Sequence, residues 1–434
     1  MTRILILGGS FAGMATARAL ERTLRLDEAE ITLVSRENFS VFTPMLPEVS
    51  SGNLEARHIV TPIRAQLSRA RFILGEVDAI DLDARRVEVE HPLDGTRRTL
   101  EYDHIVFGLG SVTSTFNLPG IEERSLPMKT LRDADTMRNH ILSVVELADV
   151  TADPDRRRRL LTFAIVGGGF TGVEVAGELV DFFRSILPFY RSIDHAEVAI
   201  YLIEGGPKLL PELQAGMGEY SAQALERRGV RILLNTPVAS ADESGLQLKN
   251  GTHIGTATIV WSAGVRPSPL VAALPIGTGR GGAIVVRPDL SVEGYPGVWA
   301  LGDCAAVPAP SGSFYPATAQ HTLRQGPLLA RNIAATLRGR PTKPFRYEAL
   351  GMMASLGGRR GVAGLRGRYL LTGFIAWALW RTYYLARLPG IDRRLRVTVD
   401  WTLGLIFPRD IAELRVYARR DDELLGSPET ATRK

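Results

Sequence analysis

The feature that most limits the fold of this chain is one supersecondary pattern that occurs twice. In each copy an apolar segment, at 4–7 and at 163–166, runs directly into a glycine-rich turn and then into a segment of small residues. A further apolar segment follows each copy, at 30–35 and at 198–204. Strand, glycine turn, helix and strand in this order form a βαβ unit. The repeat predicts an α/β protein with two Rossmann-like dinucleotide-binding domains, which suits a length of 434 residues.

The glycines of these turns stand where binding of a pyrophosphate requires them. In the pattern G-x-G-x-x-G the first glycine makes the bend, the second lets the backbone approach the phosphates, and the third lets the helix pack on the strand. The second turn has all three, Gly167, Gly169 and Gly172, whereas the first has Ser10 at the middle position. One such turn alone would also be compatible with plain packing, but two turns at domain spacing favour two dinucleotide sites.

An acidic residue at the end of the second strand of such a unit normally binds a ribose hydroxyl. Glu204 has this position in the second unit, and its charge would repel the 2′-phosphate of NADPH, so NADH is expected there. In the first unit the position is taken by Ser35, followed by Arg36 and Glu37. The Ser35 hydroxyl or Glu37 would substitute for the missing acid, and Arg36 would cover the adenine.

Two further acidic residues have positions that suggest chemistry. Asp303 follows Gly302 at the end of the apolar segment 297–301, where a carboxylate is suited to bonding a ribityl hydroxyl of a flavin. The alternative is an ordinary aspartate turn. Glu174 lies two residues after Gly172, in the first turn of the predicted helix. Its carboxylate either stabilises the helix dipole or lies beside a nicotinamide, where it would position the hydride donor or relay a proton.

Cysteine content and charge exclude several classes of function. The single cysteine, Cys304, excludes a disulfide framework, a cysteine-rich metal site and an intramolecular dithiol couple, so redox chemistry would fall to a cofactor. No signal peptide precedes the first apolar segment, which predicts a cytoplasmic chain. Residues 338–420 contain 17 lysines and arginines against 5 acidic residues, a charge that suits either nucleic acid or an anionic membrane surface.

An aromatic and apolar segment at 369–388 decides between these two partners. Its uncharged part is shorter than the roughly 20 residues that span a bilayer, so we expect an interfacial helix that lies on the membrane. The alternative is a helix of the core or of a dimer interface. Because the apolar residues are continuous, nucleic acid is not expected. The arginines assigned to anionic lipid are Arg366, Arg368, Arg381 and Arg387.

With these residues assembled, the chain resembles the type II NADH dehydrogenases, which are single-subunit NADH:quinone oxidoreductases of the glutathione-reductase-like flavoprotein superfamily. The resemblance covers nearly the whole chain. The segments that carry it are 8–13, 42–46 with Glu48, 167–178, 261–265, Gly302-Asp303, and 316–321 leading to Gln325-Gly326. It implies that FAD binds in the first domain and NADH in the second, and that a monotopic enzyme takes its quinone from the membrane.

The resemblance also implies a role for individual residues. It assigns catalysis to Glu174 and Gln320, and the quinone side to Gln320, Thr322 and Gln325. The residues implied for NADH are Gly167, Gly169, Phe170, Thr171, Gly172, Glu204 and Gly264. Those implied for FAD are Gly8, Ser10, Phe11, Ala12, Gly13, Ser35, Arg36, Thr43, Pro44, Val77, Gly110, Gly302, Asp303, Ala319 and Gln320.

Thr322 and Arg324 depart from the alanine and glutamine usual in this part of the family, which bears on the identity of the acceptor. His321 would be a base or a structural residue, and the structural interpretation is favoured. The predicted boundaries are 1–120 with 280–345 for a discontinuous FAD domain, 121–279 for an NADH domain inserted in it, and 346–434 for membrane association.

The predicted function is hydride transfer from NADH to FAD followed by two-electron transfer to a membrane quinone, without proton pumping. The enzyme would be a peripheral homodimer on the cytoplasmic face of the cell membrane. Sulfide:quinone oxidoreductases share the architecture but need paired cysteines. Two alternatives remain: a flavoprotein reductase with a soluble protein acceptor, and an apoptosis-factor-like nucleotide sensor.

Overall fold

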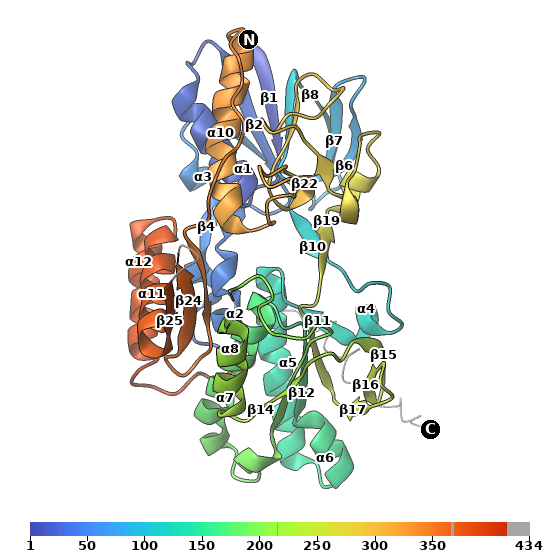
Figure 1. Ribbon diagram of the computed structural model, residues 1–434, viewed down its shortest axis with the longest axis vertical. Helices are drawn as coiled ribbons and strands as arrows, with labels where there is room; N and C mark the ends of the chain where they lie inside the picture. The colour runs from blue at the N-terminus through green and yellow to red at the C-terminus, as the bar shows by residue number, and fades with distance from the viewer. Residues whose placement is uncertain (215, 366–368, 415–434) are drawn as a thin grey trace. The chain divides into compact units, whose positions relative to one another are not determined.

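The structure is a computed structural model that describes residues 1–214, 216–365 and 369–414 (Figure 1). The chain forms two compact units, each assembled from three stretches of sequence. The first unit contains Met1–Val41, Val60–Val112 and Val265–Ala349. The second contains Phe42–Ile59, Thr113–Gly264 and Leu350–Lys434. The two glycine-rich turns are therefore in different units.

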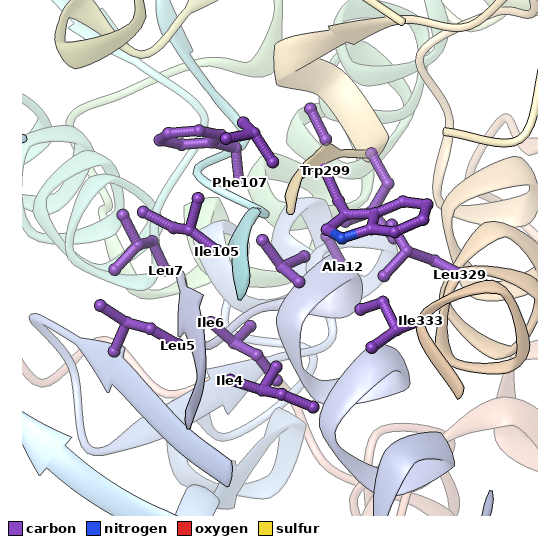
Figure 2. Packing of buried hydrophobic residues seen from close by; sticks show 14 of the residues in the cluster. Ile4, Leu5, Ile6, Leu7, Ala12, Ile105, Phe107, Trp299, Leu329 and Ile333 are labelled. Atoms are coloured by element: carbon purple, nitrogen blue, oxygen red, sulfur yellow. The ribbon is translucent and has the colours of Figure 1, made fainter. Parts of the chain in front are cut away.

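A five-stranded parallel sheet organises the first unit. Its order is β21 (Val298–Ala300), β9 (His104–Phe107), β1 (Thr2–Leu7), β2 (Ala29–Ser35) and β5 (Arg71–Leu74). The strands are apolar along their length because a parallel sheet is covered on both faces. Figure 2 shows side chains of β1 and β9 in the core, together with Trp299 and with Leu329 and Ile333 from α10 (Ala319–Leu337).

Helix α10 packs against α1 (Phe11–Thr23), the helix that follows the first glycine-rich turn. The two helices approach closely at Gly326, where an added Cβ would lie only 2.7 Å from the Cβ of Ala15. The unit is completed by short elements around the sheet: β3 (Phe39–Val41), β4 (Val60–Pro62), α3 (Ile63–Gln66), β6 (Glu76–Asp81), β7 (Arg86–Glu90), β8 (Arg97–Glu101), β19 (Val265–Pro267), α9 (Pro269–Ala272), β20 (Ile284–Val285) and β22 (Ala305–Ala306).

The second unit repeats the parallel architecture. Its sheet has the order β11 (Ser125–Pro127), β18 (Thr258–Trp261), β12 (Thr162–Val166), β13 (Ala199–Ile203) and β14 (Val230–Leu233). The second glycine-rich turn joins β12 to α7 (Phe170–Ile186). The other elements are α2 (Leu46–Ser50), α4 (Ile121–Arg124), α5 (Leu131–Val150), α6 (Pro154–Leu160), α8 (Met217–Glu226), β15 (Val238–Asp242), β16 (Gly245–Leu248) and β17 (His253–Gly255). Between the units along the chain, β10 covers Ser111–Thr113.

The C-terminal stretch adds a small antiparallel sheet and two helices to the second unit (Figure 1). The strands are β23 (Gly351–Ser355), β24 (Gly361–Leu365) and β25 (Tyr369–Thr372), followed by α11 (Gly373–Arg387) and α12 (Ile391–Leu403). The predicted helix at 369–388 is thus a strand followed by a helix, because Gly373 takes a φ of +68° that breaks the two apart. Within the described ranges, no helix combines the length and the apolarity that crossing a bilayer demands.

The two glycine-rich turns have the same internal geometry. Gly8 and Gly167 take φ values of +106° and +111°. A Cβ on Gly13 would lie 1.8 Å from the Gly8 carbonyl oxygen, and a Cβ on Gly172 would lie 1.8 Å from that of Gly167. Gly169, in contrast, has no atom within 4 Å of its would-be Cβ. The chain itself therefore requires the first and third glycines, but not the middle one.

This geometry predicts a contrast between alanine variants of the second turn. Gly172→Ala should lower the free energy of unfolding by about 1–3 kcal/mol, since its methyl group must displace a main-chain oxygen. Gly169→Ala is the matched control in the same turn and should change it by less than about 0.5 kcal/mol. Urea denaturation of the two variants and the wild type measures the difference. Equal stabilities of the two variants would contradict the role assigned to Gly172.

Candidate functional site

In the first unit, segments far apart in the sequence meet beside the first glycine-rich turn. A Cβ on Gly302 would lie 3.3 Å from the Cβ of Ala12 and 3.2 Å from Cγ2 of Thr322. The main-chain N–H of Gly302 donates a hydrogen bond to the Gln325 side chain, at 2.9 Å. These contacts bring together three segments: the residues that follow β21, the start of α1 and the first turns of α10. Residues predicted to bind FAD lie in all three.

Further predicted residues lie at strand ends of the same unit. Asp303 accepts a hydrogen bond from the Ser111 hydroxyl at 2.7 Å. Ser35 ends β2, and its Cβ would lie 2.7 Å from a Cβ on Gly9. The side chain of Val77 is buried in the core. Gly110 has a φ of +66° and open space in front of it.

The other residues predicted to bind FAD differ in exposure, and two of them belong to the second unit. Ser10 and Arg36 are exposed, and Phe11 is half-buried. Ser10 is the N-cap of α1, the position that Gly169 has in α7. Thr43 and Pro44 begin a short 3-10 helix, Thr43–Met45, that belongs to the second unit.

The first turn of α10 contains Gln320 and His321. The side-chain oxygen Oε1 of Gln320 accepts a hydrogen bond from the Tyr347 hydroxyl at 2.6 Å. The His321 ring bonds the Thr318 hydroxyl through Nδ1, at 2.8 Å. Burial, reinforced by the charge of Arg324, lowers the pKa of His321 below its ordinary value of 6.5. The imidazole is therefore neutral at pH 7, a form compatible with both interpretations of this residue.

In the second unit, Glu204 directly follows β13 and supports the second glycine-rich turn. One carboxylate oxygen accepts a hydrogen bond from the N–H of Gly168 at 2.6 Å, and the other accepts one from Gly206 at 2.7 Å. Each oxygen keeps a further lone pair, so the carboxylate can also accept from ribose hydroxyls. Gly264 lies under the ring of Phe116, which is 2.4 Å from a would-be Cβ.

Glu174 is buried in the second unit, and its hydrogen bonds to the described residues all end on one carboxylate oxygen. Its Oε1 accepts a hydrogen bond from the main-chain N–H of Ser355 at 3.0 Å and another from the Trp380 indole at 2.9 Å. Both partners come from the C-terminal stretch. A helix position four residues later carries Glu178, which is also buried and lies on the same face of α7.

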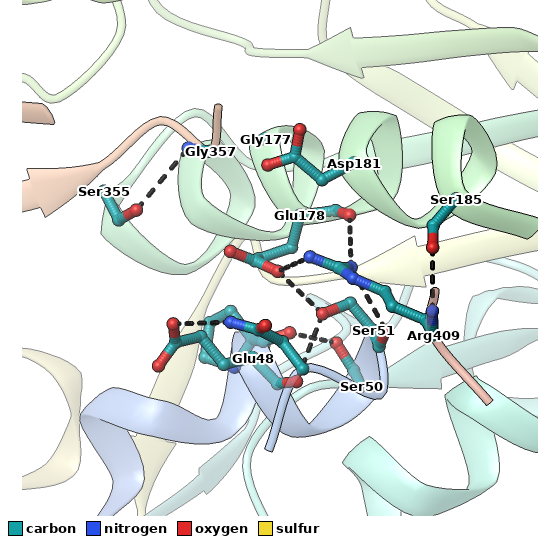
Figure 3. A network of polar contacts seen from close by, with 12 residues as sticks. Glu48, Ser50, Ser51, Gly177, Glu178, Asp181, Ser185, Ser355, Gly357 and Arg409 are labelled. Carbon is teal, nitrogen blue, oxygen red and sulfur yellow. Dashed lines mark hydrogen bonds and ion pairs between the residues drawn. The ribbon is translucent and has the colours of Figure 1, made fainter. Parts of the chain in front are cut away.

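Glu178 and Glu48 complete what we call the buried carboxylate cluster, Glu48, Glu174 and Glu178. Figure 3 shows Glu48 and Glu178 with their partners. Glu178 accepts hydrogen bonds from the Ser51 hydroxyl at 2.7 Å and from the Arg409 guanidinium at 2.9 Å. Glu48, on α2, accepts from Asn53 at 2.9 Å, from the Trp401 indole at 3.2 Å and from Arg381 at 3.4 Å. Three carboxylates are thus matched by two bonded arginines.

Burial and the surplus of negative charge both raise the pKa values of carboxyls in this cluster. Burial raises the pKa of Glu174 to about 8, because its N–H partners offset only part of the lost hydration. Burial also raises the pKa of Glu48, against the opposing charge of Arg381. Glu174 has no arginine bonded to it in the described chain, and a pKa of about 8 favours its protonated form at neutral pH. Since Oε1 accepts two N–H groups, the proton belongs on Oε2.

Arg381 corrects one prediction about the C-terminal segment. It was assigned to anionic lipid, but its guanidinium is turned inward, between the rings of Trp377 and Trp401, each 4.4 Å away. Only 17% of the Arg381 side chain is exposed. Trp380, counted with the same apolar segment, is buried beneath Glu174. Arg387 lies over the Tyr383 ring, and Arg366 and Arg368 fall outside the described residues.

Sequence reasoning used Glu48 and Glu178 only as parts of motifs and gave them no role. The sequence does contain one signal for Glu178: it lies four residues after Glu174 on a helix whose neighbouring residues are Val173, Val175, Ala176 and Leu179. Glu48 has no comparable signal. Their partners Arg409 and Trp401 come from sequence more than 200 residues away, and nothing in the local pattern connects them.

Comparison with protein families gives two matches. Residues 2–326 match the pyridine nucleotide-disulphide oxidoreductase family, and residues 350–410 match the NDH2 C-terminal domain. Together the two matches cover both units, including the C-terminal sheet and helices.

Individual relatives agree with these families. The chain is 34% identical to the type II NADH:quinone oxidoreductase Ndh of Mycobacterium tuberculosis, over 98% of this chain and 93% of that protein. It is 32% identical to the type II NADH:quinone oxidoreductase of Staphylococcus aureus, over 84% and 90% of the two chains. A solved structure of NDH2 from Plasmodium falciparum in complex with NADH matches with a TM-score of 0.87 at 20% identity, over 95% and 99%. At that identity the likeness is one of fold.

The raised pKa of Glu174 predicts how stability depends on pH. A carboxyl whose pKa rises from 4.5 to about 8 on folding binds its proton more tightly in the folded state, so it destabilises the fold progressively as the pH increases through this range. Glu174→Gln removes the titration. The stability of this variant relative to the wild type should therefore increase between pH 5 and pH 9, measured by urea denaturation. Glu219→Gln, at an exposed glutamate of α8, is the control and should parallel the wild type. A parallel curve for Glu174→Gln would refute the assignment.

Proposed function

The chain belongs to the type II NADH:quinone oxidoreductases, a family of NADH dehydrogenases, and from this premise we propose that it oxidises NADH by way of bound FAD and reduces a membrane quinone. The observation that carries the proposal is the pair of glycine-rich turns, one in each unit, with identical internal geometry. A second observation is the burial of Glu174, which raises the pKa of its carboxyl to about 8.

The first unit fits FAD. The turn 8–13 would present the N-terminus of α1 to the pyrophosphate, and Ser10 at the middle position of the turn is exposed. Asp303 would accept from ribityl hydroxyls, with Ser111 fixing its carboxylate. Bound there, the flavin supplies the two-electron chemistry that this chain, with one buried cysteine, does not supply from its own side chains.

The second unit fits NADH. The turn 167–172 would bind the pyrophosphate, with open space at Gly169 where the backbone meets it. Glu204 would accept from the ribose hydroxyls and exclude a 2′-phosphate by charge repulsion. These contacts favour NADH over NADPH.

Glu174 would act in proton transfer. Glu174 would lie on the nicotinamide side, where a buried carboxyl with a pKa near the working pH is suited to relay a proton. Glu174 holds such a proton at Oε2, while Ser355 and Trp380 fix the opposite oxygen. Gln320, in the first unit, would bind the acceptor through its side-chain amide.

The direct test follows the flavin through both half-reactions without oxygen. The protein, purified in mild detergent, should show a flavin band near roughly 450 nm that NADH bleaches and a soluble quinone analogue rapidly restores. A colourless protein would refute the flavin. A flavin bleached by NADH but reoxidised only by oxygen or by a protein acceptor would refute the quinone and favour the soluble-acceptor reductase.

We further propose that α12 docks the enzyme on an anionic membrane. Exposed apolar side chains recur every four residues along it, at Ile391, Leu395, Val399 and Leu403, so they form one stripe. Phe374 and Ile375 of α11 are also exposed. The sequence analysis did not single out this helix, because arginines separate its apolar residues along the chain. An amphipathic helix with basic residues beside an apolar face is typical of a monotopic protein.

Charge substitutions in the stripe test this docking. The double variant Leu395→Lys with Val399→Lys should lower the fraction bound to vesicles of anionic phospholipid by about tenfold or more, because two lysines cannot enter the apolar layer. Turnover with a soluble quinone analogue should persist. The matched control places the same change at Leu26 and Leu93, exposed leucines of the first unit. Unchanged vesicle binding by the stripe variant, in co-sedimentation, would exclude α12 as the docking element.

A further inference from the structure

The ring of Phe116 lies beside the strand end next to the second glycine-rich turn, and the proposed function does not use it. The tip of the ring occupies the space in which a side chain at Gly264 would begin. The ring also meets the buried indole of Trp261 edge to face, with 6.3 Å between the centroids. Phe116 nevertheless remains 60% exposed. The ring therefore presents apolar surface to solvent at this end of β18.

The main chain at Phe116 is unfavourable for a phenylalanine. Phe116 and the next residue, Asn117, both have a φ of +53°. The N–H of Leu118 donates to the carbonyl oxygen of Thr115 at 3.1 Å, which closes a tight turn around the two residues. Asparagine tolerates the left-handed region, whereas a bulky side chain is disfavoured there. Such strain is typical of positions that serve a ligand.

Hydrogen bonds fix this tight turn to β18 and to the rest of the second unit. The N–H of Ser114 donates to the carbonyl oxygen of Gly264 at 3.0 Å, and the Trp261 indole donates to that of Ser114 at 2.8 Å. Beyond the turn, the N–H of Ala241 donates to the carbonyl oxygen of Pro119 at 3.0 Å. The position of the ring relative to β18 is therefore set by the fold.

The strand order decides which half of a dinucleotide would pass this ring. β13 lies on one side of β12 and β18 on the other, so the order reverses between β12 and β18. Dinucleotides bind across such a switch point, at the carboxyl ends of the strands. Glu204, directly after β13, would take the adenine ribose, so the nicotinamide half would extend over the end of β18. That end adjoins the glycine-rich turn, because the N–H of Ser262 donates to the carbonyl oxygen of Val166 at 2.8 Å.

We propose that Phe116 is a binding residue for the nicotinamide half of NADH and that its ring forms an apolar wall beside that half. The inference rests on the proposed function, in which the turn 167–172 binds NADH. A flat nicotinamide ring can pack against an aromatic side chain without burying an unpaired charge. The same contact gives Gly264 a physical role, because only a residue without a Cβ lets the phenyl ring approach the main chain so closely.

Two ligands that differ only in the nicotinamide test this role. NAD⁺ and ADP-ribose share the adenosine, the pyrophosphate and the second ribose, and neither reduces the flavin. Isothermal titration calorimetry on the oxidised holoenzyme measures both dissociation constants. Phe116→Asn removes the ring and suits the left-handed main chain, so it should weaken binding of NAD⁺ by about three- to tenfold. Binding of ADP-ribose should stay within about twofold of the wild type.

Two further variants distinguish loss of the contact from loss of the fold. Phe116→Tyr keeps the ring and should bind NAD⁺ as the wild type does. Phe189→Asn is the matched control, because Phe189 is an exposed phenylalanine of the second unit that follows the end of α7 remote from the glycine-rich turn. It should bind both ligands as the wild type does. The urea midpoint of Phe116→Asn should be no lower than that of the wild type.

The outcomes separate this inference from the proposed function. A wild type that binds neither NAD⁺ nor ADP-ribose would overturn the proposed NADH site. If the wild type binds both, but Phe116→Asn binds NAD⁺ equally well, the role of Phe116 alone is wrong. Equal losses of NAD⁺ and ADP-ribose in Phe116→Asn would also refute it, because the ring would then support the whole site and not the nicotinamide half.

Discussion

Each half of this protein depends on a main-chain oxygen that occupies the space where a side chain would begin. At Gly13 and at Gly172 the helix that follows the turn comes so close to the preceding strand that only a hydrogen atom fits. This approach brings the helix N-terminus to the carboxyl ends of the parallel strands, the edge at which open α/β sheets bind ligands. Gly302-Asp303 reaches the same place in the first unit, and Glu204 reaches it in the second.

Burial of charge is the second constraint, and among the residues whose burial is described it concerns the second unit. Carboxylates from α2 and α7 share an interior with two arginines from the C-terminal stretch. An unpaired buried carboxylate is costly enough that the group takes up a proton instead. The same C-terminal stretch therefore has two roles, since α12 exposes apolar side chains on one face while Trp401 of this helix bonds Glu48 on the other.

The sequence was sufficient to predict those parts of the fold that depend on local sequence pattern. Periodicity and glycine spacing predicted both parallel units, and the motifs predicted the family. What could not be predicted depends on long-range placement. Arg381 was expected to face lipid, because a linear pattern does not show which face of a helix is turned toward the core. The indole rings that enclose its guanidinium are 4 and 20 residues away in the sequence. Tyr347 lies in an irregular segment with no periodicity to interpret. The site residues, the homodimer and the membrane face remain predictions.

The open space in front of Gly169 separates two requirements on the turn. A Cβ added there would meet no described atom within 4 Å, so the described part of the chain leaves room for a small side chain at that position. The exposed Ser10, at the equivalent position of the first turn, is such a small side chain. Folding of the turn and its fit to a ligand can therefore be altered separately, the first at Gly172 and the second at Gly169.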